Sequence, residues 1–65
     1  MIPLPIRLRK TRTESGISQA RLADELGLER KTIQRLESGV KVSRYTMFAV
    51  EHWMHRRRRA RTTVG

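Results

Sequence analysis

Four long side chains that donate hydrogen bonds lie close together in the segment GLERKTIQRLESG, residues 27–39. They are Arg30, Lys31, Gln34 and Arg35. In the major groove of DNA, Arg and Lys can reach O6 and N7 of guanine, and Gln can pair with N6 and N7 of adenine. These residue types therefore predict base readout, provided that one helix presents them on the same side.

The spacing of these residues fits a helix with two different sides. A helix that begins near Arg30 turns by about 100° per residue, which places Ile33 and Leu36 together on an inward side. The three donors after Arg30 then lie on the opposite side, and Arg30 projects from the first turn. An ordinary solvated helix face would look the same in isolation, so the neighbouring elements have to support the prediction.

A second short helix is expected just before this one, over residues 19–26. Ser18 is suited to cap its N-terminus. Gly27 ends it, because glycine accepts the left-handed backbone of a helix C-terminus. Its apolar residues share one face: Leu22, Ala23 and Leu26. Two short helices joined by a glycine turn, the second apolar inside and donor-rich outside, form the helix-turn-helix pattern.

Two further helices are expected to pack against this pair. The first would run from residue 5 or 6 to residue 14, and the last from residue 44 to about residue 56, with Ser43 as its N-cap. The apolar arc of the last helix is wider than one core contact requires, so we expect a dimer interface on it. The candidate interface residues are Met47, Val50, Trp53 and Met54. The sequence thus predicts an all-α, compact four-helix domain, with a fifth helix as the alternative.

Positive charge is concentrated in the flanks of the chain. The net charge of +9 consists of +3 in residues 1–17, +1 in residues 18–42 and +5 in residues 43–65. A small domain this basic usually meets a polyanion, most often nucleic acid. Residues 1–56 are expected to form the DNA-binding domain, with the helix-turn-helix at about 18–38. Residues 57–65 are expected to be a basic, disordered tail, which either contacts phosphates or only adds solvated charge.

Composition and short motifs argue against several other classes of protein. The chain has no cysteine for a disulfide or a Cys-based zinc site, and we interpret Glu51, His52 and His55 as exposed helix residues without a metal. The longest apolar run, residues 47–50, is far shorter than the roughly 20 residues that span a membrane. The N-terminal residues lack the order of a secretory signal, so a cytoplasmic protein is expected. The sequence contains no glycine-rich phosphate loop and no evident pair of carboxylates, so neither an enzyme nor a cofactor is expected.

The segment ISQARLADELGLERKTIQRLESG resembles the helix-turn-helix of the Cro/CI-type (XRE) family of phage and bacterial regulators. The matching residues are Gln19, Leu22-Ala23, Leu26-Gly27, Ile33 and Leu36-Glu37-Ser38-Gly39, with Arg12 at the family's usual interval before Gly16. The resemblance covers about residues 6–52 and implies a lambda-repressor-like fold. The segment SRYTMFAVEHW is more weakly similar to the anti-CRISPR-associated repressors, which are phage-borne autoregulators.

The resemblance implies roles for individual residues. Arg30, Lys31 and Arg35 would read base edges, and Gln34 is a further candidate for base readout. Gln19 would donate to a DNA phosphate from the start of the second helix. The other candidate phosphate contacts are Arg21, Thr32, Lys41 and Arg44. Arg12 and Glu37 would pair and tie the first helix to the third, although from the residues alone Glu37 is equally well explained as a solvated acid.

Two residues depart from the family pattern. Arg21 stands where family members often carry an acid, and a cation there opposes the helix dipole. We interpret Arg21 as tolerated because a phosphate lies near that helix end. Glu29 stands where a Ser, Thr or Asp N-cap is usual. It would cap the third helix, accept a hydrogen bond from a cytosine amino group, or face away from DNA.

These observations together predict a sequence-specific transcriptional repressor. It would bind an inverted-repeat operator in double-stranded DNA as a homodimer, with its own operon as a candidate target. One alternative is the antitoxin of a toxin–antitoxin pair, which would need a toxin-binding extension. Another is an RNA-binding module, which would need aromatic stacking platforms, whereas the aromatic side chains here are expected to be committed mostly to packing. No metal, cofactor or membrane partner is expected.

Overall fold

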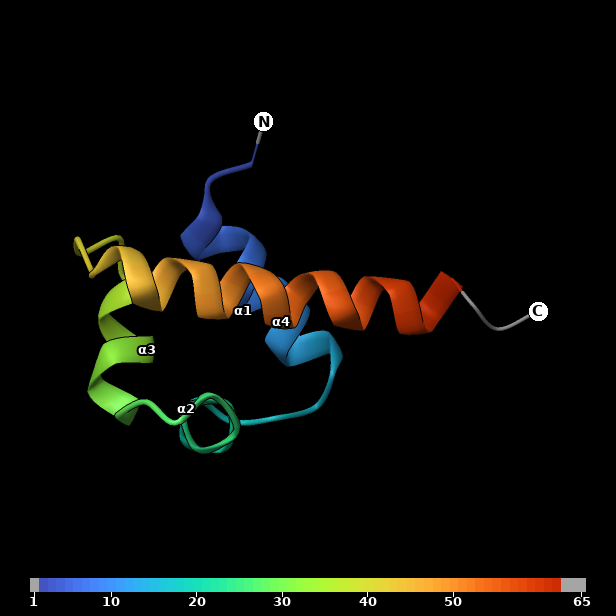
Figure 1. Ribbon diagram of the computed structural model, residues 1–65, viewed down its shortest axis with the longest axis horizontal. Coiled ribbons are helices and arrows are strands. Elements are labelled where there is room, and N and C mark those ends of the chain that lie inside the picture. The colour runs from blue at the N-terminus through green and yellow to red at the C-terminus, as the bar shows by residue number, and fades with distance from the viewer. Residues whose placement is uncertain (1, 63–65) are drawn as a thin grey trace.

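The computed structural model describes the backbone of residues 2–62 and the side chains of residues 2–57. Four α-helices follow one another along this part of the chain: α1 (Leu4–Glu14), α2 (Gln19–Leu26), α3 (Arg30–Glu37) and α4 (Arg44–Thr62). In Figure 1, α4 runs along the length of the molecule, with α2 and α3 below it and α3 at one end. The predicted all-α, four-helix architecture is confirmed.

Helix α2 begins and ends where the sequence predicts, and local hydrogen bonds explain both ends. The hydroxyl oxygen of Ser18 accepts a hydrogen bond from the backbone N–H of Arg21 at 3.1 Å, which caps the N-terminus. At the other end Gly27 adopts a left-handed conformation with φ 69°, and the N–H of Leu28 donates to the carbonyl of Ala23 at 2.8 Å. The chain therefore turns sharply at Gly27 and starts α3 three residues later.

The outer helices differ from the prediction at their ends. Helix α1 begins at Leu4, with Pro5 in its first turn. The backbone N–H that proline lacks would have no partner within the helix at this position, so the helix loses no hydrogen bond. Helix α4 continues to Thr62, so the predicted end near Arg56 is wrong. Arginine and alanine are good helix formers, and no Gly or Pro follows Arg56 before Gly65, so nothing local stops the helix there. The disorder predicted for residues 63–65 lies outside the described residues.

One hydrophobic core holds the four helices together. Its buried residues are Leu8 from α1, Leu22 and Ala23 from α2, Ile33 and Leu36 from α3, and Val50, Trp53 and Met54 from α4. Helices α2 and α3 make the most extensive contact, and Leu22 and Ile33 are fully buried. Burial of a side chain of this size contributes about 1.5–3 kcal/mol. The two helices of the helix-turn-helix are thus fixed to each other and to the rest of the domain.

The core also contains three of the four candidate dimer-interface residues. The exposed fraction is 0% for Val50, 7% for Trp53 and 6% for Met54. Their assignment to a surface for a second copy is therefore wrong, because the apolar side of α4 is covered by the other helices of the same chain. Met47 is 39% exposed and is still available to a partner.

Candidate nucleic-acid interface

The four candidate base-reading side chains are all exposed on α3: Arg30, Lys31, Gln34 and Arg35. On the opposite side of the helix, Ile33 is 0% and Leu36 is 4% exposed. Among the described residues, none of the four donors makes a side-chain hydrogen bond or ion pair. The outer side of α3 therefore offers a row of donors to a ligand, and the inner side holds the helix in place.

The ion pair between Arg12 and Glu37 joins α1 to α3, as the family resemblance implies. Arg12 Nε donates to Glu37 Oε2 at 2.7 Å, and Arg12 Nη2 donates to Glu37 Oε1 at 3.1 Å. The two side chains are 12% and 5% exposed. Hydrogen bonding to Glu37 raises the pKa of Arg12 above its ordinary value, against the lowering effect of burial, and the charge of Glu37 adds to the rise. Glu37 is therefore a buried partner of Arg12 and not a solvated acid.

The same ion pair also reaches the start of α2. Arg12 Nη1 donates to the backbone carbonyl of Ile17 at 3.0 Å, and Gln19 Nε2 donates to Glu37 Oε1 at 3.1 Å. One guanidinium and one carboxylate thus connect α1, the beginning of α2 and the end of α3. Sequence reasoning missed the contact between Gln19 and Glu37, because nothing local links two residues that are 18 positions apart.

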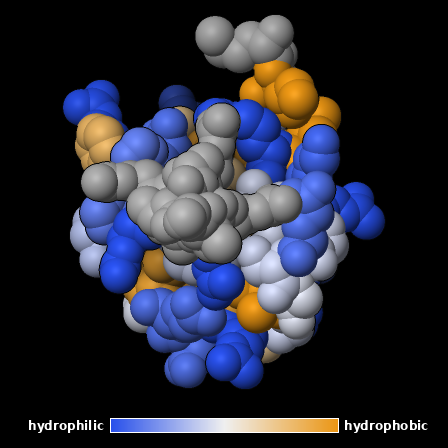
Figure 2. All heavy atoms as spheres, turned by 90° about the vertical axis from the view of Figure 1, so that its right-hand side faces the viewer, coloured by the Kyte–Doolittle hydropathy of each residue, from blue (hydrophilic) through white to orange (hydrophobic). Residues whose placement is uncertain are grey.

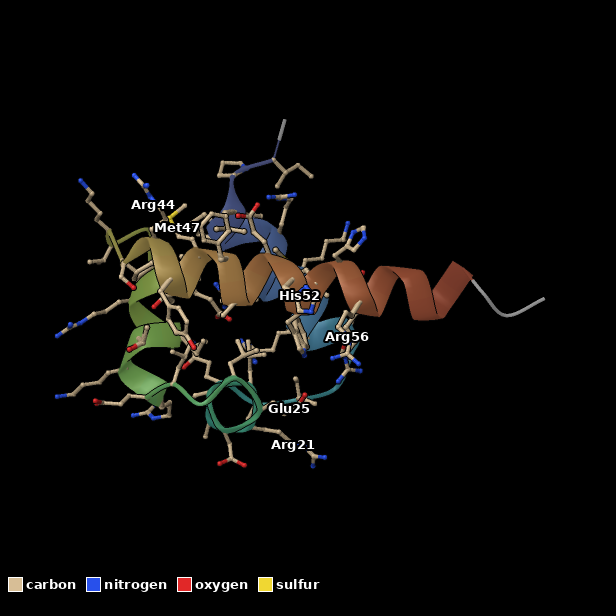
Figure 3. All side chains as sticks on the ribbon, viewed as in Figure 1. Arg21, Glu25, Arg44, Met47, His52 and Arg56 are labelled. Carbon is tan, nitrogen blue, oxygen red and sulfur yellow. The ribbon has the colours of Figure 1, made fainter. Side chains whose placement is uncertain are left out.

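The remaining candidate phosphate contacts do not lie in one place. Figure 3 shows Arg44 at the end of the molecule that holds α3, whereas Arg21 and Glu25 lie together beside α2 and below α4. Lys41, in the connection between α3 and α4, is exposed, and Thr32 is half-buried. Arg21 Nε lies 3.8 Å from Glu25 Oε2 on the next turn. An exposed pair of this kind contributes at most about 1 kcal/mol, so Arg21 can readily exchange partners.

Glu29 occupies the N-cap position of α3, yet its side chain makes no capping hydrogen bond. Its backbone carbonyl instead accepts from the N–H groups of Thr32 at 3.0 Å and Ile33 at 3.4 Å. Of the three roles considered for Glu29, the structure thus removes side-chain capping. The exposed carboxylate is left either to accept from a cytosine amino group or to face away from DNA.

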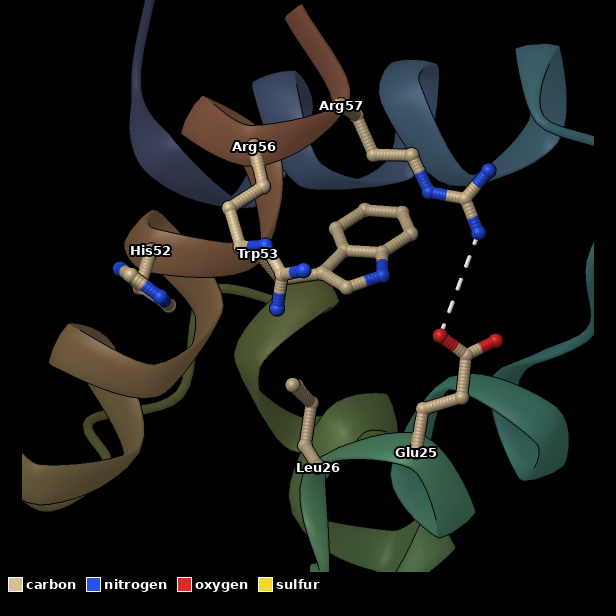
Figure 4. A pocket seen from close by; sticks show the side chains of 6 residues that line it. All are labelled: Glu25, Leu26, His52, Trp53, Arg56 and Arg57. Carbon is tan, nitrogen blue, oxygen red and sulfur yellow. Dashed lines mark ion pairs between the residues drawn. The ribbon is translucent and has the colours of Figure 1, made fainter. Parts of the chain in front are cut away.

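A pocket of about 400 Å³ lies between α2 and α4. It is lined by Glu25, Leu26, His52, Trp53, Arg56 and Arg57. The guanidinium of Arg57 lies 5.1 Å from the ring centroid of Trp53 and 3.9 Å from Glu25 Oε1 (Figure 4). The ion pair with Glu25 attaches α4 to α2, and the contact with Trp53 holds the Arg57 side chain against its own helix. Arg57 therefore belongs to the folded domain, although the sequence analysis places it in the tail.

The basic end of α4 lies far from the donors on α3. In Figure 1 the helix leads away from α3 towards the opposite end of the molecule. Figure 2 looks onto that opposite end, where the described side chains are mostly hydrophilic. The cations of Arg56 and Arg57 are therefore not part of the surface around α3. The side chains of residues 58–65, for which the sequence leaves open phosphate contact or solvated charge, lie outside the described residues.

In the described part of the chain, no group of three His, Cys, Asp or Glu side chains is placed to hold a metal ion. Glu51, His52 and His55 are exposed on α4. Nor does any helix in the same part of the chain combine the length and hydropathy that a membrane span needs.

Comparison with known protein families matches residues 8–51 to a family model described as helix-turn-helix. The matched residues make up more than half of the 65-residue chain. They begin within α1, include α2, the turn at Gly27 and α3, and end within α4. Comparisons with curated proteins and with solved structures give no significant match.

Proposed function

Since the chain belongs to the helix-turn-helix family HTH_3, the Cro/CI type (XRE), we propose that this DNA-binding domain is a transcriptional repressor that recognises a specific operator. Domains of this family are typically non-catalytic. One observation carries the proposal: α3 exposes four donors without partners among the described residues, and its opposite side is buried. Bound at a promoter, the protein would exclude the transcription machinery from the same DNA.

In the proposed complex α3 enters the major groove, where each base pair presents a distinct set of donors and acceptors. Arg30, Lys31 and Arg35 would select guanines, and Gln34 would select an adenine. Lys41 and Arg44, at the α3 end of the molecule, would bind phosphates, as would Thr32. Two copies related by a two-fold axis would place their α3 helices about 34–36 Å apart, in successive major grooves. Such an arrangement requires an inverted-repeat operator, for which the promoter of the chain's own operon is a candidate.

An exposed apolar face on α4 is available to the second copy. Tyr45 is 71% and Phe48 is 64% exposed, one turn apart at the α3 end of the helix, and Met47 in the same turn is 39% exposed. The expectation that these aromatic side chains pack inside is wrong, because Val50 and Trp53 fill the core on the other side of α4. Aromatic side chains contribute strongly at interfaces, since each buries a large apolar area. We therefore assign the dimer contact to this aromatic face.

Replacing Phe48 with Glu should weaken binding to the full operator by about tenfold, because a charge cannot be buried between two copies without a partner. Binding to an isolated half-site should change little, since Phe48 is not on α3. Mobility-shift titrations with full and half sites would measure both, and analytical ultracentrifugation would measure dimer formation on the operator. His55→Glu is the matched control, with the same added acid two turns further along α4. Equal losses on full and half sites would contradict the assignment of the dimer face.

Selection of binding sites from random double-stranded DNA tests the proposed function as a whole. The expected result is a short half-site that occurs twice in inverted orientation, with centres about 10 base pairs apart. Enrichment of single, asymmetric sites would contradict the homodimer. Failure to enrich any sequence would contradict specific readout by α3.

A further inference from the structure

Gln19 is held in place before any ligand arrives. It is the first residue of α2, and its Nε2 donates to Glu37 Oε1 at 3.1 Å. Glu37 is 5% exposed, and both of its carboxylate oxygens also accept from Arg12. Gln19 itself is half-buried. A flexible side chain at the edge of the candidate interface is therefore attached to a fixed and buried acceptor.

We propose that Glu37 is a positioning residue that orients the carboxamide of Gln19 towards a DNA phosphate. A carboxamide nitrogen carries two N–H groups, and the bond to Glu37 uses one of them. The second N–H is free to donate to a phosphate oxygen. Because the side chain has already lost its rotamer freedom, less conformational entropy is lost when the phosphate binds. The inference rests on the proposed DNA-binding function and adds a second role to a residue that otherwise only joins α1 to α3.

The start of α2 suits a phosphate in two further ways. The first N–H groups of a helix have no partner within the helix, and its N-terminus carries a partial positive charge. Ser18 Oγ accepts from only one of these groups, the N–H of Arg21. A phosphate that accepts from Gln19 would therefore also lie against the favourable end of the helix dipole. The hydrogen bonds among Arg12, Glu37 and Gln19 add a side-chain donor with a fixed direction to this general preference of helix N-termini for anions.

Arg12 explains how an acid can lie close to a polyanion. An uncompensated carboxylate next to a phosphate would repel it. Arg12 binds Glu37 through two N–H groups, at 2.7 and 3.1 Å, so the negative charge is balanced at short range. The third hydrogen bond of Arg12, to the carbonyl of Ile17 at 3.0 Å, fixes the backbone that leads into α2. The phosphate would thus meet an oriented neutral amide, not a bare acid.

The positioning role and simple electrostatics predict opposite signs for one substitution. Removing an acid from a protein that binds DNA should strengthen binding, because repulsion from the phosphates falls. Glu37→Gln should instead weaken binding, because a neutral carboxamide no longer serves Arg12 and Gln19 together as an acceptor. Glu25→Gln is the matched control, since it removes an acid from α2 whose side chain is 37% exposed and forms its ion pairs with Arg21 and Arg57, whereas Gln19 donates to Glu37.

Gln19→Asn tests the same contact from the other side. Asparagine keeps the carboxamide but is one methylene shorter, so it cannot reach Glu37 and a phosphate at once. Affinity for the selected operator would be measured for the wild type, for Gln19→Asn, Glu37→Gln and their double variant, and for Glu25→Gln. Thermal unfolding of each variant would show that it is folded at the assay temperature.

We expect Gln19→Asn and Glu37→Gln each to weaken operator binding by about tenfold, the effect of one hydrogen bond to a charged group. The double variant should bind no more weakly than the weaker single variant, and Glu25→Gln should not bind more weakly than the wild type. The salt dependence of binding should be unchanged in Gln19→Asn, because a neutral donor releases no counterion.

Two results would contradict the positioning role alone, and a third would contradict the proposed function as well. If Gln19→Asn binds as tightly as the wild type, the positioning role is wrong and the proposed function stands. The same holds if the two single effects multiply in the double variant, since independent contacts behave in that way. If Glu37→Gln is unfolded, the Gln19→Asn result alone decides. A wild-type chain that prefers no DNA sequence would remove the proposed function, and the inference with it.

Discussion

Glu37→Ala should lower the free energy of unfolding by about 3 kcal/mol or more, because it leaves the guanidinium of Arg12 largely buried without its partner. Small domains are stable by only about 5–15 kcal/mol, so this single change would remove much of the margin. Urea unfolding followed by circular dichroism would measure the loss. The hydrogen bonds of Gln19 and Arg12 to Glu37 would be lost together. The attachment of α3 to α1 and to the start of α2 would therefore weaken at the same time.

A double substitution separates the cost of the orphaned charge from the value of the pair itself. Arg12→Met combined with Glu37→Leu replaces the ion pair by apolar side chains, and we expect it to recover most of the lost stability. DNA binding should not recover with it, because Gln19 would still lack its acceptor. If Glu37→Ala and the double variant were equally destabilised, the unpaired guanidinium would not be the cause.

The stability that Arg12 contributes should not depend on pH in the neutral range. Its pKa is raised in the folded state, so the contribution is fully present below the pKa of the unfolded chain. It is lost only as the pH rises through the still higher pKa of the folded state. Both pKa values lie far above neutral pH, so the guanidinium of Arg12 keeps its positive charge throughout the neutral range.

Arg35→Ala should reduce binding to the selected operator about 5- to 150-fold, the equivalent of about 1–3 kcal/mol, while binding to an unrelated duplex changes far less. Arg35 is exposed on α3 and, among the described residues, has no partner to lose, so the change should leave the fold intact. Fluorescence anisotropy with both duplexes at one salt concentration would measure the ratio of specific to non-specific affinity. That ratio, and not either affinity alone, identifies a residue that reads bases.

Arg56→Ala provides the matched comparison for Arg35. It removes the same side chain and charge from the end of the molecule opposite α3, where Arg56 lies beside the pocket between α2 and α4 (Figure 3). We expect this variant to leave the ratio of the two affinities unchanged, with at most a uniform loss from the lower net charge. An equal loss of specific and non-specific binding in Arg35→Ala would show that Arg35 binds phosphate and does not read a base.

The parts of the fold that were predicted correctly depend on neighbours in the sequence. Ser18 caps a helix through a residue three positions away, and Gly27 turns the chain by its own backbone conformation. The two sides of α3 follow in the same way from helical periodicity. Signals of this kind act within one or two turns, so the residues alone reveal them.

The errors concern contacts between distant segments. Periodicity showed that α4 has an apolar side but not which helices cover it, so Val50 and Trp53 were assigned to a partner when they belong to the core. The pair of Arg12 and Glu37, 25 positions apart, was predicted only through the family resemblance. The run of arginines after His55 was interpreted by its charge alone, although its helix propensity favours continuation of α4.

The packing of Arg57 against Trp53 gives the domain its own optical probe. Trp53 is the single tryptophan of the chain, it is buried, and its ring lies between α2 and α4 under a guanidinium. Its emission should therefore report on the joint between these two helices, without any label. The ring is separated from the donors on α3, so operator binding does not change its surroundings directly. A spectral change upon binding would therefore mean that the packing between α2 and α4 changes. An unchanged spectrum would mean that the domain binds as a rigid unit.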